Sequence, residues 1–377
     1  MIDNKKCYIH KQCGGCNIHD IKYEESLVNK TNMVKDILNT KLDVMPNINN
    51  IIGMNNPYNY RNKAKYVFGY NKTTRKPIMG FFLGGTHKII EGSNCMIQDE
   101  TINEIASYIA VLVNKHQINI YNEDAKKGFL RHLVIKVGMN TKEVMVIFVT
   151  TDSKMFKREV IIKDLINKFP NIKTIVQNIN DKQTNFVLGD KNIVLYGNGY
   201  IMDYLGEYKF KISANSFYQV NSIQTELIYN TAIKFACLKK SDIVYDLYSG
   251  IGTISLFVSK YIKKGYGIEI ISDAVKDARQ NAKINKINNI EFIQGKVEMV
   301  LPKLYKQGIK PDVIFVDPPR SGLDKRTIKT IIDISPNKVI YISCNPVTLA
   351  FDLSLLKESY NIDVVQPVDM FPFTRTC

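Results

Sequence analysis

The amino-acid sequence predicts an α/β protein with two folded parts, a central α+β domain and a C-terminal domain built on a parallel sheet. Residues 50–200 contain mainly β-rich runs, interrupted by two helical stretches. From about residue 215, short apolar strand candidates alternate with helical segments, which is typical of a parallel sheet with helices on both faces. A turn with two glycines joins the first of these strands to the next helix, as expected in a doubly wound sheet.

The composition is that of a globular protein with a basic surface. Of 377 residues, 45% are hydrophobic and 23% are charged, enough for two or three domains. The formal net charge is +15, which favours a polyanionic partner, although a bias toward Ile, Asn and Lys would raise the charge without any ligand. No apolar run reaches the length of about 18 residues that a membrane span needs. No apolar signal region precedes the cysteines, so we expect a cytoplasmic protein.

The pattern divides the chain into four segments. Residues 1–20 hold a cysteine cluster, and residues 21–50 contain a helix from Ile21 through Leu42. Residues 51–214 form the central α+β domain, and residues 215–377 form the C-terminal α/β domain. In the central domain, strands are expected at 65–70, 133–137 and 144–149, and helices near 99–116 and 156–169. In the C-terminal domain, strands are expected at 242–247, 264–269, 290–293, 312–317 and 338–343.

The first candidate site follows the strand at 242–247, where the sequence from Asp246 to Thr253 reads DLYSGIGT. Gly250 and Gly252 would let a ligand approach the backbone, and the helix that starts after them would point its amino end at that ligand. Glu269 ends the next strand, where a carboxylate can accept hydrogen bonds from both hydroxyls of a ribose. A dinucleotide site usually has a third glycine. The D-x-x-x-G-x-G form is associated instead with methyltransferases that bind S-adenosylmethionine.

Two further strand ends carry candidate chemistry, because the carboxyl ends of parallel strands line the ligand crevice. Asp317 ends the strand at 312–317 and precedes two prolines and Arg320. Amino-group methyltransferases typically have an aromatic residue in place of Arg320, so methylation of an amino nitrogen is disfavoured. Cys344 follows the strand at 338–343. A thiolate that adds to carbon 6 of a pyrimidine makes carbon 5 nucleophilic, so Cys344 is the candidate nucleophile, with a buried structural cysteine as the alternative.

Four cysteines form a separate candidate site. Cys7, Cys13 and Cys16 have the spacing C-x5-C-G-G-C, and Cys95 supplies a fourth thiol. In a cytosolic protein, clustered cysteines more often bind a metal or react than form disulfides. Four thiolates suit a [4Fe–4S] cluster or a zinc ion, and the spacing alone does not separate the two.

Two basic segments are candidates for a surface that faces nucleic acid. Residues 59–66 read NYRNKAKY and residues 129–133 read FLRHL. Cations can hold phosphates and aromatic rings can stack on unpaired bases, while the alternative is an ordinary solvated strand face.

Together, these motifs resemble the RNA 5-methyluridine (uracil-C5) methyltransferase family, specifically its iron–sulfur 23S ribosomal RNA branch. The resemblance covers nearly the whole chain, and its motifs are FYQVN at 217–221, the 246–253 turn, DPPR at 317–320, SCNP at 343–346 and DMFP at 369–372. It implies a Rossmann-like S-adenosylmethionine methyltransferase domain and an iron–sulfur site in the α+β domain. The cysteine pattern of this branch implies a [4Fe–4S] cluster bound by Cys7, Cys13, Cys16 and Cys95.

The resemblance also implies roles for individual residues and partners. Cys344 is expected to be the catalytic nucleophile. Contacts with the methyl donor are expected from Gln219, Tyr248, Thr253, Glu269 and Asp317. Enzymes that act on cytosine commonly have a cysteine beside proline in the Asp317 motif, and its absence here favours uridine. A monomer acting on a flipped or single-stranded uridine of 23S ribosomal RNA is expected, with transfer RNA as the alternative substrate and non-catalytic RNA binding as the alternative function.

The chain departs from the family pattern at both ends. Most ribosomal members begin with a small TRAM-type β-barrel that binds RNA, whereas Cys7 lies almost at the start here. Family members continue past the Phe-Pro-x-Thr segment into a His-x-Glu stretch whose Glu removes a proton, whereas this sequence ends at Cys377. We therefore expect that the methyltransferase domain is truncated at its C-terminus, in a fragment or a frame-altered product, or that the protein is impaired. Loss of a general base typically slows a reaction by about 10²–10⁴-fold. The transfer RNA branch generally lacks both the barrel and the cysteine cluster.

Overall fold

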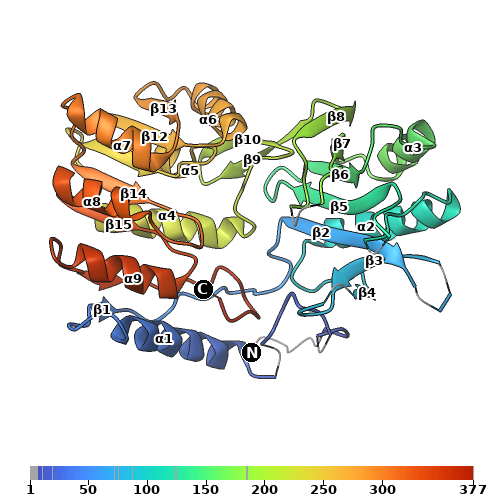
Figure 1. Ribbon diagram of the computed structural model, residues 1–377, viewed down its shortest axis with the longest axis horizontal. Helices are drawn as coiled ribbons and strands as arrows, with labels where there is room; N and C mark the ends of the chain where they lie inside the picture. Colours follow the sequence, from blue (N-terminus) through green and yellow to red (C-terminus); the bar gives the residue numbers. More distant parts are fainter. Residues whose placement is uncertain are drawn as a thin grey trace.

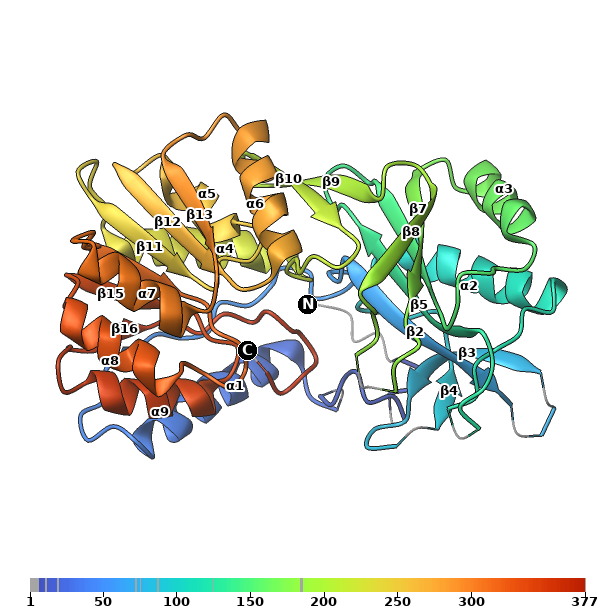
Figure 2. The same ribbon diagram turned by 45° about the horizontal axis from the view of Figure 1, so that its top comes forward.

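The computed structural model describes residues 7–10, 12–18, 20–71, 73–74, 76–86, 88–123, 125–183 and 186–376. Two bodies lie side by side, the C-terminal α/β domain on the left and the central domain on the right (Figure 1; Figure 2). A hairpin of β9 (Tyr200–Leu205) and β10 (Tyr208–Ser213) lies between them. Within these residues, no helix combines the length and the apolar character needed to cross a membrane.

The central domain is a seven-stranded sheet with two helices on one face. The strand order is β4-β3-β2-β5-β6-β7-β8, and only the β6–β7 pair is parallel. The strands are β2 (Lys63–Tyr70), β3 (Pro77–Phe82), β4 (Ile89–Glu91), β5 (Leu130–Val137), β6 (Val144–Thr150), β7 (Ile172–Ile179) and β8 (Lys191–Tyr196). Helices α2 (Glu100–Lys115) and α3 (Arg158–Lys168) bury apolar residues such as Ile105 and Leu165 against the sheet. The expected strands at 65–70, 133–137 and 144–149 and both expected helices are confirmed.

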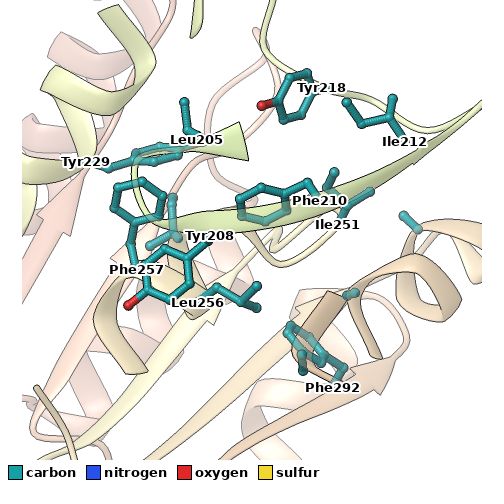
Figure 3. Close-up of a cluster of buried hydrophobic side chains, with 14 of the residues drawn as sticks. Leu205, Tyr208, Phe210, Ile212, Tyr218, Tyr229, Ile251, Leu256, Phe257 and Phe292 are labelled. Atoms are coloured by element: carbon teal, nitrogen blue, oxygen red, sulfur yellow. The ribbon is translucent and has the colours of Figure 1, made fainter. Parts of the chain in front are cut away.

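The opposite face of this sheet belongs to a core that continues into the C-terminal domain. Val134 and Ile147 on this face share one apolar cluster with Phe210 of the β9–β10 hairpin and with Leu256 of the C-terminal domain. Every residue of β6 is therefore buried, because each face of that strand is covered. Figure 3 shows the aromatic part of this shared core around Phe210. The two domains are joined by apolar packing as well as by the chain.

The C-terminal domain is a five-stranded parallel sheet in the order β13-β12-β11-β14-β15. Its strands are β11 (Ile243–Leu247), β12 (Lys264–Glu269), β13 (Ile290–Gln294), β14 (Val313–Val316) and β15 (Lys338–Tyr341), close to the predicted ranges. Helices α4 (Ser222–Ala236), α5 (Thr253–Ser259) and α6 (Ser272–Ile284) contribute to the core on one face, and α7 (Val297–Lys306) and α8 (Lys325–Ile334) to the core on the other. The predicted parallel sheet with helices on both faces is confirmed.

The strand order places a ligand crevice at the centre of this sheet. The chain starts at β11, moves outward to β12 and β13, and then crosses back to β14 on the other side of β11. Loops that follow β11 and β14 therefore diverge, which opens a crevice at the carboxyl ends of these strands. The predicted turn and Asp317 both lie at this position.

The helix near the N-terminus packs against the C-terminal part of the chain. Helix α1 (Tyr23–Asn39) is shorter than expected and lies beside α9 (Pro346–Leu356). Leu38 and Ala350 belong to the same small core, and β1 (Asn47–Ile48) pairs in parallel with β16 (Val364–Val365). The 21–50 segment thus completes the C-terminal body, although it precedes the central domain in sequence.

Candidate active site

The turn after β11 has a backbone suited to close ligand approach. Gly250 and Gly252 have φ values of +54° and +84°, in the left-handed region that glycine tolerates best. A Cβ at Gly252 would lie 2.7 Å from the Phe292 ring, so glycine is needed there for packing. A Cβ at Gly250 would meet no atom within 4 Å, so this part of the turn faces open space. Tyr248 also has a positive φ of +68°, which for a tyrosine stores strain of about 1–3 kcal/mol.

Three carboxylates from three neighbouring strands surround this turn. Asp246 is 2% exposed, and its Oδ2 accepts hydrogen bonds from the Ser255 amide (2.9 Å) and hydroxyl (2.6 Å). Glu269 accepts hydrogen bonds from the amides of Gly250 (3.0 Å) and Ile271 (2.7 Å). Asp317 follows β14 directly.

Burial makes two of these carboxyl groups unusually weak acids. It raises the pKa of Asp317 to about 7. Burial, reinforced by the negative charge of Asp317, also raises the pKa of Asp246 to about 7. Several buried polar atoms of the described residues lack a hydrogen-bond partner, and two of them, Asp246 Oδ1 and Ser249 Oγ, lie at this turn. Unpaired buried polar atoms are costly, so a polar or cationic ligand at this position would be favoured.

Cys344 lies in a loop that is tied to the Asp317 loop. Asn345 caps α9 through its side-chain oxygen, and its side-chain nitrogen donates to the Arg320 carbonyl at 3.0 Å. The Asn345 backbone amide donates to Ser343 Oγ at 3.1 Å, which closes the chain around the thiol. Since β14 and β15 are adjacent, Cys344 and Asp317 follow neighbouring strand ends, and Cys344 is partly exposed.

The FYQVN segment, which leads into α4, contacts both the central domain and the DMFP motif. The Asn62 side chain, next to the start of β2, donates to the Gln219 carbonyl at 2.9 Å and to Ser222 Oγ at 3.1 Å. Asn221 caps α4 and donates to the Met370 carbonyl at 3.1 Å. The FYQVN and DMFP motifs, about 150 residues apart, are therefore in direct contact.

The predicted donor-binding residues do not all present their side chains to the crevice. Thr253 Oγ1 lies 3.0 Å from the hydroxyl of Tyr229, a buried residue of α4, and the Gln219 side chain lies near enough to lower the pKa of that hydroxyl. Tyr248 instead packs its ring with the core beneath α7 and α8, where burial raises its pKa to about 12. Only the backbone of Tyr248 therefore belongs to the turn. Tyr229 was not among the predicted site residues, because a tyrosine within a helix carries no motif.

The four cysteines of the separate site lie close enough to influence one another electrostatically. Burial, followed by the neighbouring thiols Cys95 and Cys13, raises the pKa of Cys16 to about 12. Cys16 and Cys95 pack in one cluster with Phe373. The backbone of Cys13 forms an isolated antiparallel β-bridge with Leu83, which follows β3. In the part of the chain that is described, no group of three or more His, Cys, Asp or Glu is arranged to hold a metal ion. The four thiols therefore lie near one another, but their arrangement in the described residues does not show the predicted metal site.

One of the two basic segments is structural. Arg131 is 4% exposed and donates to the carbonyls of Asn180 and Lys182, each at 2.9 Å. Burial lowers the pKa of His132 to about 4, so this imidazole is neutral at pH 7. Residues 129–133 therefore offer little positive charge to a polyanion.

A cavity of about 500 Å³ lies away from the turn. It follows β15 between α4 and α9, and it reaches Ser343 and Met370. None of the predicted catalytic or donor-binding residues lines this cavity.

Known proteins are similar to this chain in sequence and in fold. A family model described as tRNA (Uracil-5-)-methyltransferase matches residues 190–377. An uncharacterized RNA methyltransferase of Bacillus cereus is 44% identical over 372 residues, which are 98% of this chain and 81% of that protein. One from Clostridium acetobutylicum is 45% identical over 372 residues, 98% of this chain and 80% of that protein. The crystal structure of the Pyrococcus abyssi tRNA (uracil-54, C5)-methyltransferase with S-adenosyl-L-homocysteine matches 96% of this chain and 83% of that one, with a TM-score of 0.77 and 26% identity.

Proposed function

Because the chain belongs to the family of S-adenosylmethionine-dependent RNA (uracil-5-)-methyltransferases, we propose that it methylates carbon 5 of a uridine in 23S ribosomal RNA. The observation that carries this proposal is that three predicted site features follow three adjacent parallel strands. The glycine turn after β11, Asp317 after β14 and Cys344 after β15 lie at the same edge of the sheet. A methyl donor, a uracil base and a nucleophile could therefore meet in one crevice.

The residues around the turn fit S-adenosylmethionine. Glu269 would accept hydrogen bonds from the ribose beside the Gly250 amide that it already contacts, and the open space above Gly250 leaves room for the ligand. The unpaired Asp246 Oδ1 and the carboxyl of Asp317 would attract the positive charges of the donor. The relative from Pyrococcus abyssi was solved with S-adenosyl-L-homocysteine, the demethylated form of this donor, which supports the assignment.

Cys344 would act as the nucleophile on the base. Its thiolate adds to carbon 6 of uracil, and the electrons of the 5,6 double bond move onto the carbon 4 carbonyl. Carbon 5 then takes the methyl group from the sulfonium of the donor, and the sulfur–methyl bond breaks. A general base removes the proton on carbon 5, and the bond from Cys344 to carbon 6 breaks as the double bond returns. The covalent adduct is therefore resolved, and the thiol is regenerated.

The first basic segment supports RNA as the substrate. Lys63 Nζ lies 5.4 Å from the ring centre of Phe217, which is 61% exposed and precedes Gln219 by two residues. In the described parts of the chain, neither Lys63 nor Lys65 forms an ion pair. Burial, together with the charges of Lys65 and Arg61, lowers the pKa of Lys63 to about 8. Uncompensated cations beside an exposed ring suit an RNA phosphate and an unstacked base.

A methylation assay tests this function and separates the two RNA classes. The protein is purified without oxygen and incubated with methyl-labelled donor and either unmodified ribosomal RNA or transfer RNA. We expect 5-methyluridine in digests of 23S ribosomal RNA. The names of the family model and of the Pyrococcus abyssi relative favour transfer RNA instead, and label confined to transfer RNA would support that alternative. Absence of label from both RNAs, with RNA still bound, would contradict the enzymatic function.

We also propose that Cys7, Cys13, Cys16 and Cys95 hold a [4Fe–4S] cluster. The donor set suits it, because the four partly buried thiols lie near one another and none of the four is in a disulfide. Methyl transfer requires no electron, so the cluster would have a structural role or a role in RNA binding. This site joins the two ends of the chain, since the amides of Asn17 and Ile18 both donate to the Phe373 carbonyl at 3.0 Å.

Metal analysis tests the cluster directly. We expect about four iron and four sulfide ions per chain after purification without oxygen. In a Cys95→Ser variant, bound iron and the visible absorption should fall strongly, because one of the four ligands is lost. Cys237→Ser, which removes an exposed cysteine at the end of α4, is the matched control and should retain both. Stoichiometric zinc without iron would contradict the cluster while leaving the four-thiol site intact.

A further inference from the structure

Tyr229 is a buried polar residue beside the donor turn that the mechanism above does not use. It lies on α4, is 3% exposed and packs edge-to-face on Phe257, with ring centres 5.3 Å apart and planes at 70°. Figure 3 shows the two rings together at the side of the shared core. Apolar packing accounts for the ring but leaves the hydroxyl unexplained.

The Tyr229 hydroxyl hydrogen-bonds to one residue of the turn and lies near a second residue that comes from a separate segment. It lies 3.0 Å from Oγ1 of Thr253, the first residue of α5. The Gln219 side chain, which comes from the loop before α4, lies near enough to the same oxygen to lower the pKa of the phenol. Since a phenol has one proton to donate and can also accept, it can hold both partners in a fixed arrangement.

This hydroxyl remains protonated at neutral pH. Burial, followed by the negative charges of Asp317 and Asp246, raises the pKa of Tyr229 far above its ordinary value. The group therefore acts as a neutral donor and acceptor rather than as a base.

The surroundings of Tyr229 suit one end of the methyl donor. S-adenosylmethionine has a ribose at one end and an amino acid, with an ammonium and a carboxylate, at the other. Glu269 suits the ribose and lies on the β12 side of the turn. On the α4 side, the Tyr229 hydroxyl contacts the hydroxyl of Thr253, and the amide of Gln219 and two carboxyl groups lie nearby. Carboxyl groups attract an ammonium, and neutral amide and hydroxyl groups can hydrogen-bond to either charged group of the amino acid.

We propose that Tyr229 is a positioning residue for the amino-acid end of the methyl donor, acting by holding Gln219 and Thr253 in their binding positions. This inference rests on the proposed function, because it requires a methyl donor at the turn. It predicts that loss of the hydroxyl weakens only those ligands that carry the amino-acid end.

Calorimetry with two ligands tests the inference. S-adenosylhomocysteine carries the amino-acid end, whereas 5′-methylthioadenosine has the same nucleoside without it. For Tyr229→Phe, we expect the Kd of S-adenosylhomocysteine to rise by about 3–12-fold, the equivalent of one hydrogen bond, and the Kd of 5′-methylthioadenosine to stay within about twofold. In the methylation assay, the KM for the donor should rise while kcat changes little, because binding is the affected step.

A matched variant removes another buried hydroxyl from the same aromatic cluster. Tyr208 packs on the other side of Phe257, with ring centres 5.2 Å apart, and Tyr208→Phe should leave the Kd of both ligands unchanged. Thr253→Val provides a second route, and the double variant Tyr229→Phe/Thr253→Val should bind S-adenosylhomocysteine no more weakly than the weaker single variant.

The outcomes separate this inference from the function on which it rests. Equal weakening of both ligands in Tyr229→Phe, or no weakening of either, would overturn the positioning role while leaving donor binding established. Failure of the unaltered protein to bind S-adenosylhomocysteine would overturn the donor site itself and the inference with it.

Discussion

Replacing Cys344 with alanine should reduce methylation of RNA by roughly 10³-fold or more, because no other group would add to carbon 6 of the uracil. Binding of S-adenosylhomocysteine should stay within about twofold, since Cys344 follows β15 and the donor turn follows β11. The measurement is the initial rate of 5-methyluridine formation, with calorimetry in parallel. Cys237→Ser is the control, because it removes an exposed thiol that lies away from the crevice.

The covalent step can be observed separately from turnover. RNA that carries 5-fluorouridine has no proton at carbon 5 to lose, so the adduct should accumulate after methyl transfer. With the unaltered protein and donor, we expect a band of increased mass on a denaturing gel, and none with Cys344→Ala. Methylation by Cys344→Ala at a rate near that of the unaltered protein would exclude this cysteine as the nucleophile.

Replacing Lys30 with methionine should lower the free energy of unfolding by about 3–5 kcal/mol, because a buried carboxylate would lose its ion-pair partner. Lys30 and Asp369 are 2% and 0% exposed, and Lys30 Nζ lies 2.5 Å from Asp369 Oδ1. The same ammonium donates to the carbonyls of Phe371 at 3.1 Å and Thr376 at 2.8 Å. Lys30 thus joins α1 to the 369–376 segment.

Denaturant unfolding of Lys30→Met measures this loss. Lys35→Met is the matched control, because Lys35 is exposed on the same helix and its replacement should change the free energy of unfolding by less than about 0.5 kcal/mol. Asp369 would keep the hydrogen bond from the Tyr23 hydroxyl at 2.8 Å, which limits the loss. Similar stabilities of the two variants would mean that the buried pair contributes little to the α1 contact.

The residues of the candidate site could be predicted where they belong to short sequence motifs. Asp317 and Cys344 could be placed together from the sequence alone, because both follow apolar strands and parallel strands end at one edge of a sheet. The side-chain direction of Tyr248 could not be predicted, since it depends on the local left-handed backbone of the turn. Tyr229 could not be predicted for a different reason: its partner Thr253 and its neighbour Gln219 come from segments after and before α4.

The alternation of strands and helices and the positions of the glycines determined the parallel sheet and its crevice, because these patterns act over short stretches of chain. Contacts across the length of the chain depended on the path of the backbone. The packing of α1 on α9, the Lys30–Asp369 pair and the meeting of Cys16 with Phe373 each join residues more than 300 positions apart. Periodicity shows that a face will be buried, but not which distant segment will cover it, because many apolar surfaces satisfy the same burial. Only the tertiary structure could therefore decide that the two ends of the chain pack together and support the catalytic domain.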